Sequence, residues 1–178
     1  LFFSSCRNDY TPKPRGFFRI DFPKKSYQPY DSAACPFTFE YPIYARVIPD
    51  TEGLTGFCWL NMDFPHYEGR LHLSYKPLNH DLEKYTEDTR TLAYKHSLKA
   101  DAIDEKLLSV TPHVNGMLYI MEGNTASSLQ FFLTDSNRHF LRGALYFNVV
   151  PQSDSLAPVL DFIGKDILHM IETFRWTR

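Results

Sequence analysis

The chain has 178 residues and a mass of 20.8 kDa, enough for one well-buried core, and its 43% hydrophobic and 22% charged residues exclude wholesale disorder. The net charge of −2, without any Lys/Arg block longer than Lys24–Lys25, argues against nucleic-acid binding. The aromatic content of 16% favours β-sheet, and no apolar stretch reaches the roughly 20 residues that a membrane-spanning helix needs.

The first six residues, LFFSSC, have the form of the end of a lipoprotein signal. An apolar run and two small residues precede Cys6, and small side chains are typical of the position before a signal cleavage site. We therefore predict lipidation at Cys6; the alternative is an N-terminal tail with an incidental cysteine. The proline-rich residues 10–15 predict an extended tether, so residues 1–15 form the anchor region and residues 16–178 form a single α+β domain.

Two sets of strands are predicted. The first set comprises residues 16–22, 37–47, 58–64 and 71–75, where apolar and polar side chains alternate. The second set comprises residues 106–110, 117–121, 128–134 and 141–150, and the short link at 135–139 predicts a hairpin between the last two.

Two amphipathic helices complete the pattern, one over residues 80–103 with Asn79 as N-cap and one over residues 155–175. The apolar stripe of the first contains Leu82, Tyr85, Thr89, Leu92, Ala93, His96, Ala100 and Ile103, and that of the second contains Leu156, Leu160, Ile163, Ile167, Ile171 and Phe174. The order ββββ–α–ββββ–α with hairpin links predicts an α+β fold, in which two helices cover a mainly antiparallel sheet of about seven or eight strands. A PsbP-like sandwich is one architecture of this description.

No sequence motif of a known catalytic class is present: there is no G-x-S-x-G, H-E-x-x-H, Walker A loop, G-x-G-x-x-G or C-x-x-C. We therefore expect no catalytic residue, metal or cofactor. Asp166, His169 and Glu172 could supply metal ligands from one helix, but a solvated face is the favoured interpretation. His96 lies mid-stripe near Thr89 and is interpreted as a buried histidine hydrogen-bonded to the sheet, with a catalytic or ligand-binding role as the alternative.

Cys35 and Cys58 are the cysteines that remain once Cys6 is assigned to lipid. In an exported protein two such residues are expected to pair, and we predict a disulfide that closes a loop of about 24 residues. The pairing requires residues 31–36 to fold back beside the third strand; the alternative is two separate buried thiols.

Several long strings resemble the gliding-motility lipoprotein GldD family of Bacteroidota from Cys6 to Trp176: YTPKPRG (10–16), FEYP (39–42), HLSYKP (72–77), TRTLAYKH (89–96), KADAI (99–103) and FLRGALYFNVVP (140–151). The resemblance implies a cell-envelope lipoprotein required for gliding and linked to type IX secretion, without an assigned enzymatic activity. It transfers one functional residue, the lipidated Cys6. The single acid after it, Asp9, favours the periplasmic side of the outer membrane.

Two hypotheses follow. The first is a non-catalytic scaffold that is anchored in the membrane by lipid and docks on gliding-motility and type IX secretion proteins. Its candidate docking residues are Tyr94 and Leu98 on the first helix and Phe162 on the second, provided that both helices cover the same face of the sheet. The second is a binder of an envelope component, or an enzyme, with its site near His96.

Overall fold

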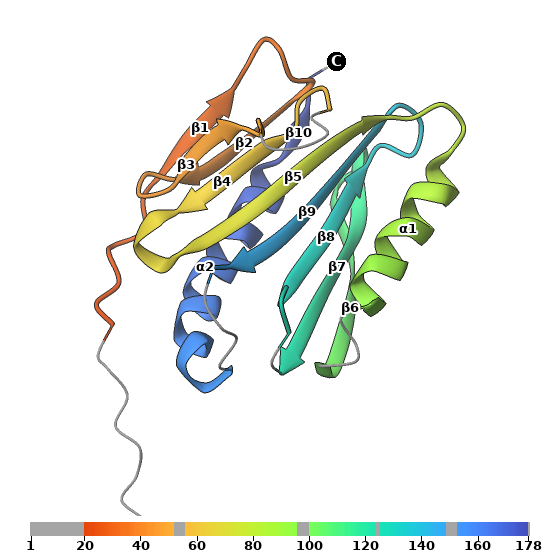
Figure 1. Cartoon of the computed structure of the whole chain (residues 1–178). Coiled ribbons are helices and arrows are strands. Elements are labelled where there is room, and N and C mark those ends of the chain that lie inside the picture. Colours follow the sequence, from red (N-terminus) through yellow and green to blue (C-terminus); the bar gives the residue numbers. More distant parts are fainter. Residues whose placement is uncertain (1–19, 52–55, 96–99, 124, 149–152, 178) are drawn as a thin grey trace, which may run out of the picture.

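The computed structural model describes residues 20–51, 56–95, 100–123, 125–148 and 153–177, and these form two antiparallel sheets, two α-helices and one 3₁₀ helix, η1 (Pro65–Tyr67) (Figure 1). The larger sheet has the strand order β3-β4-β5-β9-β8-β7-β6, and the smaller has the order β1-β2-β10. The larger sheet contains β3 (Arg46–Pro49), β4 (Leu60–Phe64), β5 (Gly69–Pro77), β6 (Ala100–Thr111), β7 (Val114–Gly123), β8 (Leu129–Thr134) and β9 (His139–Phe147). The smaller contains β1 (Tyr27–Asp31), β2 (Phe37–Pro42) and β10 (Arg175–Trp176). The predicted α+β class is confirmed.

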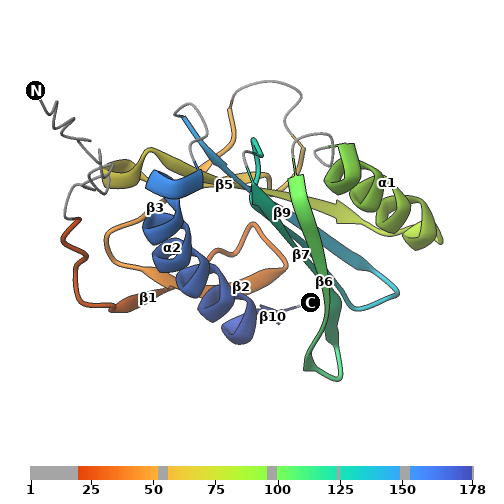
Figure 2. The ribbon, with the colours of Figure 1, turned by 90° about the horizontal axis from the view of Figure 1, so that it is seen from below.

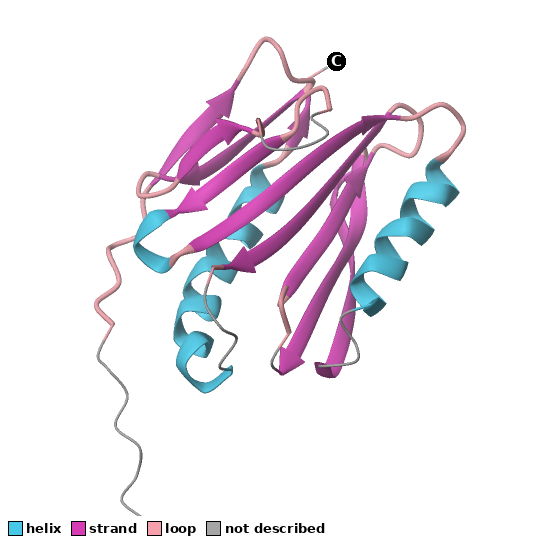
Figure 3. Ribbon diagram, in the orientation of Figure 1, coloured by secondary structure: helices cyan, strands magenta, loops and turns pink. Residues whose placement is uncertain are grey.

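The helices lie on opposite faces of the large sheet (Figures 2 and 3). α1 (Leu82–Lys95) covers the outer face, and α2 (Ser153–Thr173) covers the inner face together with the small sheet. The docking surface of Tyr94, Leu98 and Phe162 required both helices to cover the same face of the sheet. That condition is not met, so the prediction of a joint surface is wrong. None of the described helices combines the length and apolar character needed to cross a bilayer.

The main core lies between the inner face and α2. Alternate residues of each strand point inward, so Leu71 and Leu73 of β5 are buried with Phe131 of β8. They meet the α2 stripe, in which Ile163 and Ile167 have no exposed surface. A smaller outer core joins Ala93 of α1 to Tyr119 and Met121 of β7. The predicted stripe of α1 holds only in part, because Thr89 and Ala93 are buried whereas Leu92 is exposed.

The predicted hairpin at residues 135–139 is present between β8 and β9. Asp135 Oδ1 accepts backbone N–H groups from Asn137, Arg138 and His139 at 2.8–3.0 Å, and Ser136 has a φ of 69°. An Asp side chain that satisfies the turn amides is a common reason for Asp at such positions.

Three predicted elements differ from the structure. Residues 20–22 are not a strand, and residues 16–19 lie outside the described part of the chain. The first strand is β1 instead. Its Pro29 argues against a strand in the sequence, but proline is tolerated in β1 because this strand lies at a sheet edge. The alternation over 37–47 is split by a turn in which Ala45 N donates to Pro42 O, so its halves join different sheets. Residues 100–103 belong to β6 rather than to the first helix, because pairing with β7 overrides the helical periodicity.

Candidate functional site

The most heavily connected polar side chain of α2 is Asp166, which is only 1% exposed. Its Oδ1 accepts hydrogen bonds from Lys25 Nζ at 2.5 Å and from the Tyr27 hydroxyl at 3.0 Å. Its Oδ2 accepts a further hydrogen bond from the Tyr44 hydroxyl. A buried carboxylate is tolerated when its charge is paired and its lone pairs are satisfied, and Asp166 meets both conditions. We call these four residues the Asp166 cluster.

The two tyrosines of the Asp166 cluster are held in the neutral form. Burial raises the pKa of Tyr27 to about 12, and the hydrogen bond to the Asp166 carboxylate acts in the same direction. Burial, followed by the hydrogen bond to Asp166, also raises the pKa of Tyr44. A phenolate beside a carboxylate would be repelled, so both hydroxyls remain donors over the physiological range.

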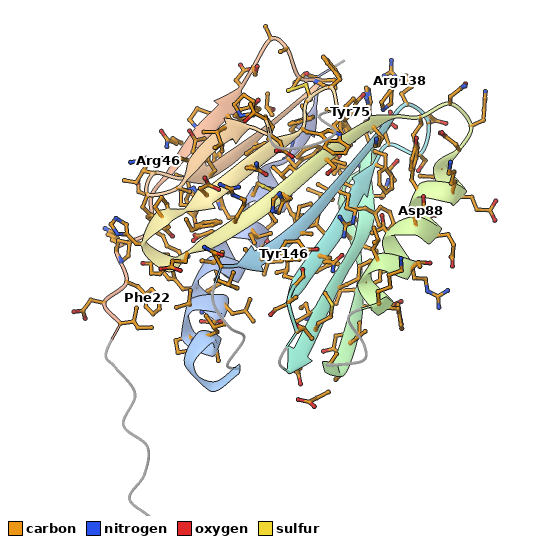
Figure 4. All side chains as sticks on the ribbon, in the orientation of Figure 1. Phe22, Arg46, Tyr75, Asp88, Arg138 and Tyr146 are labelled. Carbon is orange, nitrogen blue, oxygen red and sulfur yellow. A yellow bond between two sulfur atoms is a disulfide. The ribbon has the colours of Figure 1, made fainter. Side chains whose placement is uncertain are left out.

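The segment before β1, residues 20–26, packs against the same face of α2 (Figure 4). Phe22 stacks on Phe162 with ring centroids 4.4 Å apart, and Lys25 Nζ lies 3.9 Å from the Phe162 ring centroid while donating to the Phe162 carbonyl at 2.9 Å. Phe162 is consequently 8% exposed. The prediction that Phe162 belongs to an exposed docking surface is therefore wrong, because the chain leading from the N-terminus covers it.

Asp166, His169 and Glu172 do not form the expected solvated face. The β1–β2 hairpin covers Asp166 and part of His169, whose ring stacks on Tyr27 at 3.7 Å and whose Nε2 lies 2.7 Å from Glu40 Oε2. Glu172 is exposed. Within the described ranges, no group of three or more His, Cys, Asp or Glu side chains is arranged to hold a metal ion.

An apolar groove of about 490 Å³ lies on another side of α2, and we call it the α2 groove. Leu156, Leu160 and Leu168 line it from the helix, and Leu118 and Ile120 of β7 line it from the sheet. Leu156 and Leu160 were expected to be buried, but they line this groove and are only half-buried. The polar residues that line the α2 groove include Glu122, Thr125, Ser128, Asp161 and Lys165.

A second hollow, of about 500 Å³, opens beside β4, β5 and β9, and both polar and apolar side chains line it. Arg70 makes two hydrogen bonds to Asp63, at 2.6 and 3.1 Å, so that the charges of both are paired. Burial lowers the pKa of neighbouring His72, and the positive charge of Arg70 lowers it further. The carboxylate of Asp63 and the guanidinium of Arg70 in this hollow are therefore engaged with each other.

The remaining candidate residues divide between described and undescribed parts of the chain. Tyr94 is 41% exposed, and its hydroxyl donates to Glu105 Oε1 at 2.8 Å. Thr89 is buried, and its hydroxyl donates to the Tyr85 carbonyl of its own helix rather than to the sheet. Cys6, His96 and Leu98 lie outside the described residues.

Cys35 and Cys58 are joined by a disulfide, with their Cα atoms 5.5 Å apart. Cys35 precedes β2 of the small sheet, and Cys58 precedes β4 of the large one. The bond therefore ties the two sheets together at one end, and it is the fold-back of residues 31–36 that brings the cysteines together.

Sequence reasoning missed Lys25, Tyr27 and Tyr44 as partners of Asp166. The available signal was Asp166 itself, an acid beside Ile167 and one turn from Ile163 and Met170, all of which are buried. An acid at the border of an apolar stripe is expected to have a hydrogen-bond or ion-pair partner. The sequence does not show which distant segment supplies that partner.

These features define a class of α+β sandwich in which one helix covers each face of an antiparallel sheet. A similar solved structure is the solution structure of cyanobacterial PsbP (CyanoP) from Synechocystis sp. PCC 6803. It is 13% identical, with a TM-score of 0.53, and the match covers 85% of this chain and 93% of that chain. This likeness confirms the predicted PsbP-like fold.

The family model described as "Gliding motility lipoprotein GldD" matches residues 7–176, so the chain belongs to the GldD family of gliding motility lipoproteins. The family recognised from the sequence strings is thereby confirmed, and membership makes the chain a lipid-anchored protein of the cell envelope. No curated protein shows significant similarity to it.

Proposed function

We propose that this lipoprotein is a non-catalytic docking component of the gliding and type IX secretion apparatus, anchored through Cys6 in the outer membrane and facing the periplasm. The observation that carries the proposal is the attachment of residues 20–26 to α2. Phe22 and Lys25 lie in the segment that follows the proposed anchor, and their contacts attach this segment to the centre of the last helix. The chain that follows the proposed anchor is thus fixed to the folded body at residues 20–26.

The chemistry of the described polar sites supports the proposal over an enzymatic function. Lys25 and the two tyrosines are engaged by Asp166, and Asp63 is engaged by Arg70. An acid–base catalyst needs a group that can exchange a proton with a substrate, whereas the Asp166 carboxylate is 1% exposed and already accepts three hydrogen bonds. The outer surface of α1 with exposed Tyr94 is the candidate partner surface.

The test is a Cys6→Ala substitution in the full-length precursor. We expect the variant to lose incorporation of labelled lipid, to leave the membrane fraction, and to lose gliding. Crosslinking of intact cells, followed by affinity purification and mass spectrometry, should recover motility and secretion proteins with the wild type and not with the variant.

A Ser5→Ala substitution is the matched control, because it keeps a small residue before the cysteine and should preserve anchoring and gliding. If the wild type stays in the membrane without labelled lipid, the anchor assignment is wrong. If the wild type is lipidated and crosslinks to no motility or secretion protein, the docking role is wrong.

A further inference from the structure

The α2 groove extends along the helix from Leu156 to Leu168, about 18 Å at about 1.5 Å per residue. Leu168 is 39% exposed, and Leu156 and Leu160 are half-buried, so the fold leaves a row of leucines partly in water. A half-enclosed apolar hollow of about 490 Å³ lies within the size range of small-molecule sites.

Gly164 lies in the middle of this row of leucines, and its lack of a side chain bears on what the groove can bind. Apart from its two chain neighbours and the backbone of its own helix, a Cβ added there would meet no atom within 4 Å, so the packing of the fold does not require glycine. Glycine inside a helix is nevertheless unfavourable relative to alanine. A position that sacrifices helix stability and leaves open space is expected where an occupant approaches the helix backbone closely.

The hydrogen bonds of the groove walls restrict the chemistry of that occupant. β7 pairs with β6 on one side and β8 on the other, and Met121 N donates to Ser128 O where that ladder ends. The backbone of α2 is paired within the helix. An inserted peptide strand would bring N–H and C=O groups for which the paired stretches of β7 and α2 that the structure describes offer no backbone partner. A hydrocarbon chain carries no such groups.

We propose that the α2 groove binds a single long acyl chain. The chain would lie along Leu156, Leu160 and Leu168 and pass over Gly164, with its polar end at the rim. The side chain of Lys165 is 60% exposed at that rim and pairs with Asp161 at 2.7 Å, so the polar end would meet an exposed ion pair there.

The acyl chain comes from a separate envelope lipid rather than from the anchor of the same protein. Residues 20–26 are held by Phe162 and Asp166, which point to the opposite side of α2 from Gly164. The described start of the chain is thus held on the side of α2 that faces away from the groove. This inference goes beyond the proposed docking function and does not depend on it.

The test uses the full chain carrying Cys6→Ala, which has no lipid of its own, and palmitic acid with a photoreactive diazirine as the probe. We expect crosslinks to map to the peptides that contain residues 156–168 and 118–129. Gly164→Trp should fill the groove and weaken binding of palmitate by about tenfold or more, because several buried methylene contacts are lost.

Asp88→Trp is the matched control, since it adds the same side chain at an exposed position of α1 on the other face of the sheet (Figure 4). It should leave palmitate binding unchanged. Circular dichroism melts must show that Gly164→Trp remains folded; if it does not, Gly164→Leu takes its place in the same comparison.

Three results would overturn the proposal. The first is the absence of palmitate crosslinks in the groove, and the second is equal binding by the folded groove-filling variant. The third is protection of the groove only in protein that is lipidated at Cys6, which would assign the site to the protein's own anchor. Failure of the Cys6→Ala gliding experiment would affect the docking function and leave this result unchanged.

Discussion

Lys25 Nζ lies 2.5 Å from Asp166 Oδ1, and this contact joins the segment before the first strand to the middle of the last helix, 141 residues away in sequence. The Asp166 side chain has no exposed surface, whereas that of Lys25 is 28% exposed. The same helix carries a second ion pair, Lys165 with Asp161, whose side chains are 60% and 67% exposed. The two pairs differ in burial, and burial determines how much each contributes to stability.

Removal of the buried carboxylate should be strongly destabilising. We expect Asp166→Ala to lower the free energy of unfolding by about 3 kcal/mol, because Lys25 and two tyrosine hydroxyls lose their shared acceptor. Asp161→Ala on the same helix should change it by less than about 0.5 kcal/mol. Urea unfolding followed by circular dichroism measures both, and equal effects would contradict the importance of the cluster.

The stability of the protein should fall at high pH through Tyr27. Its pKa is about 12 in the folded protein against 10.0 unperturbed, so the unfolded chain loses this proton more readily. The contribution is therefore fully present below pH 10 and is lost as the pH rises towards 12. Urea unfolding at pH 8 and pH 11 should show a smaller decline for Tyr27→Phe than for the wild type; an identical decline would contradict this prediction.

Two glycine-to-alanine substitutions should have opposite effects. Gly164→Ala should raise the free energy of unfolding by about 0.5–1 kcal/mol, because the methyl group enters open space and the helix gains propensity. Gly143→Ala should lower it by about 1–3 kcal/mol, because the new Cβ would lie 2.2 Å from the Phe131 ring. Thermal melts of the two variants provide the comparison, and destabilisation by Gly164→Ala would show that the groove is closed in solution.

The bond between Cys35 and Cys58 should be present in protein matured outside the cytoplasm and should contribute to stability. The cysteines are 23 residues apart, a loop for which chain entropy predicts about 3 kcal/mol. Cys35→Ala with Cys58→Ala should therefore unfold at a lower urea concentration, and dithiothreitol should destabilise the wild type and not the double variant. Recovery of both as free thiols in non-reducing peptide maps would contradict the prediction.

Tyr94 should matter for function more than for stability. Tyr94→Ser removes an exposed ring and its hydrogen bond to Glu105, so the melting temperature should be nearly unchanged while gliding and recovery of envelope partners decline. Ile43→Ser, at an isoleucine that is 57% exposed and lies between β2 and β3, is the matched control and should glide normally. Normal gliding by Tyr94→Ser would place the docking surface elsewhere.

The sequence was sufficient for features that depend on local periodicity and turn chemistry. Alternation located most of the strands, the Ile163–Ile167–Ile171 spacing located the buried side of α2, and residues 135–139 predicted a hairpin that Asp135 stabilises. The recognised strings were also sufficient for the family, because they are long and extend over nearly the whole chain.

Only the tertiary structure determined what the polar sides of the helices do. Periodicity shows that Asp166 and Phe162 lie beside an apolar stripe, but the segment that covers them starts about 140 residues earlier in the chain. Likewise, Leu160 has the spacing of a core residue, yet it is half-buried and lines a groove between α2 and β7. Whether a side chain is buried depends on which distant segment of the chain packs against it. The sequence pattern shows the polarity of each side chain but does not identify that segment.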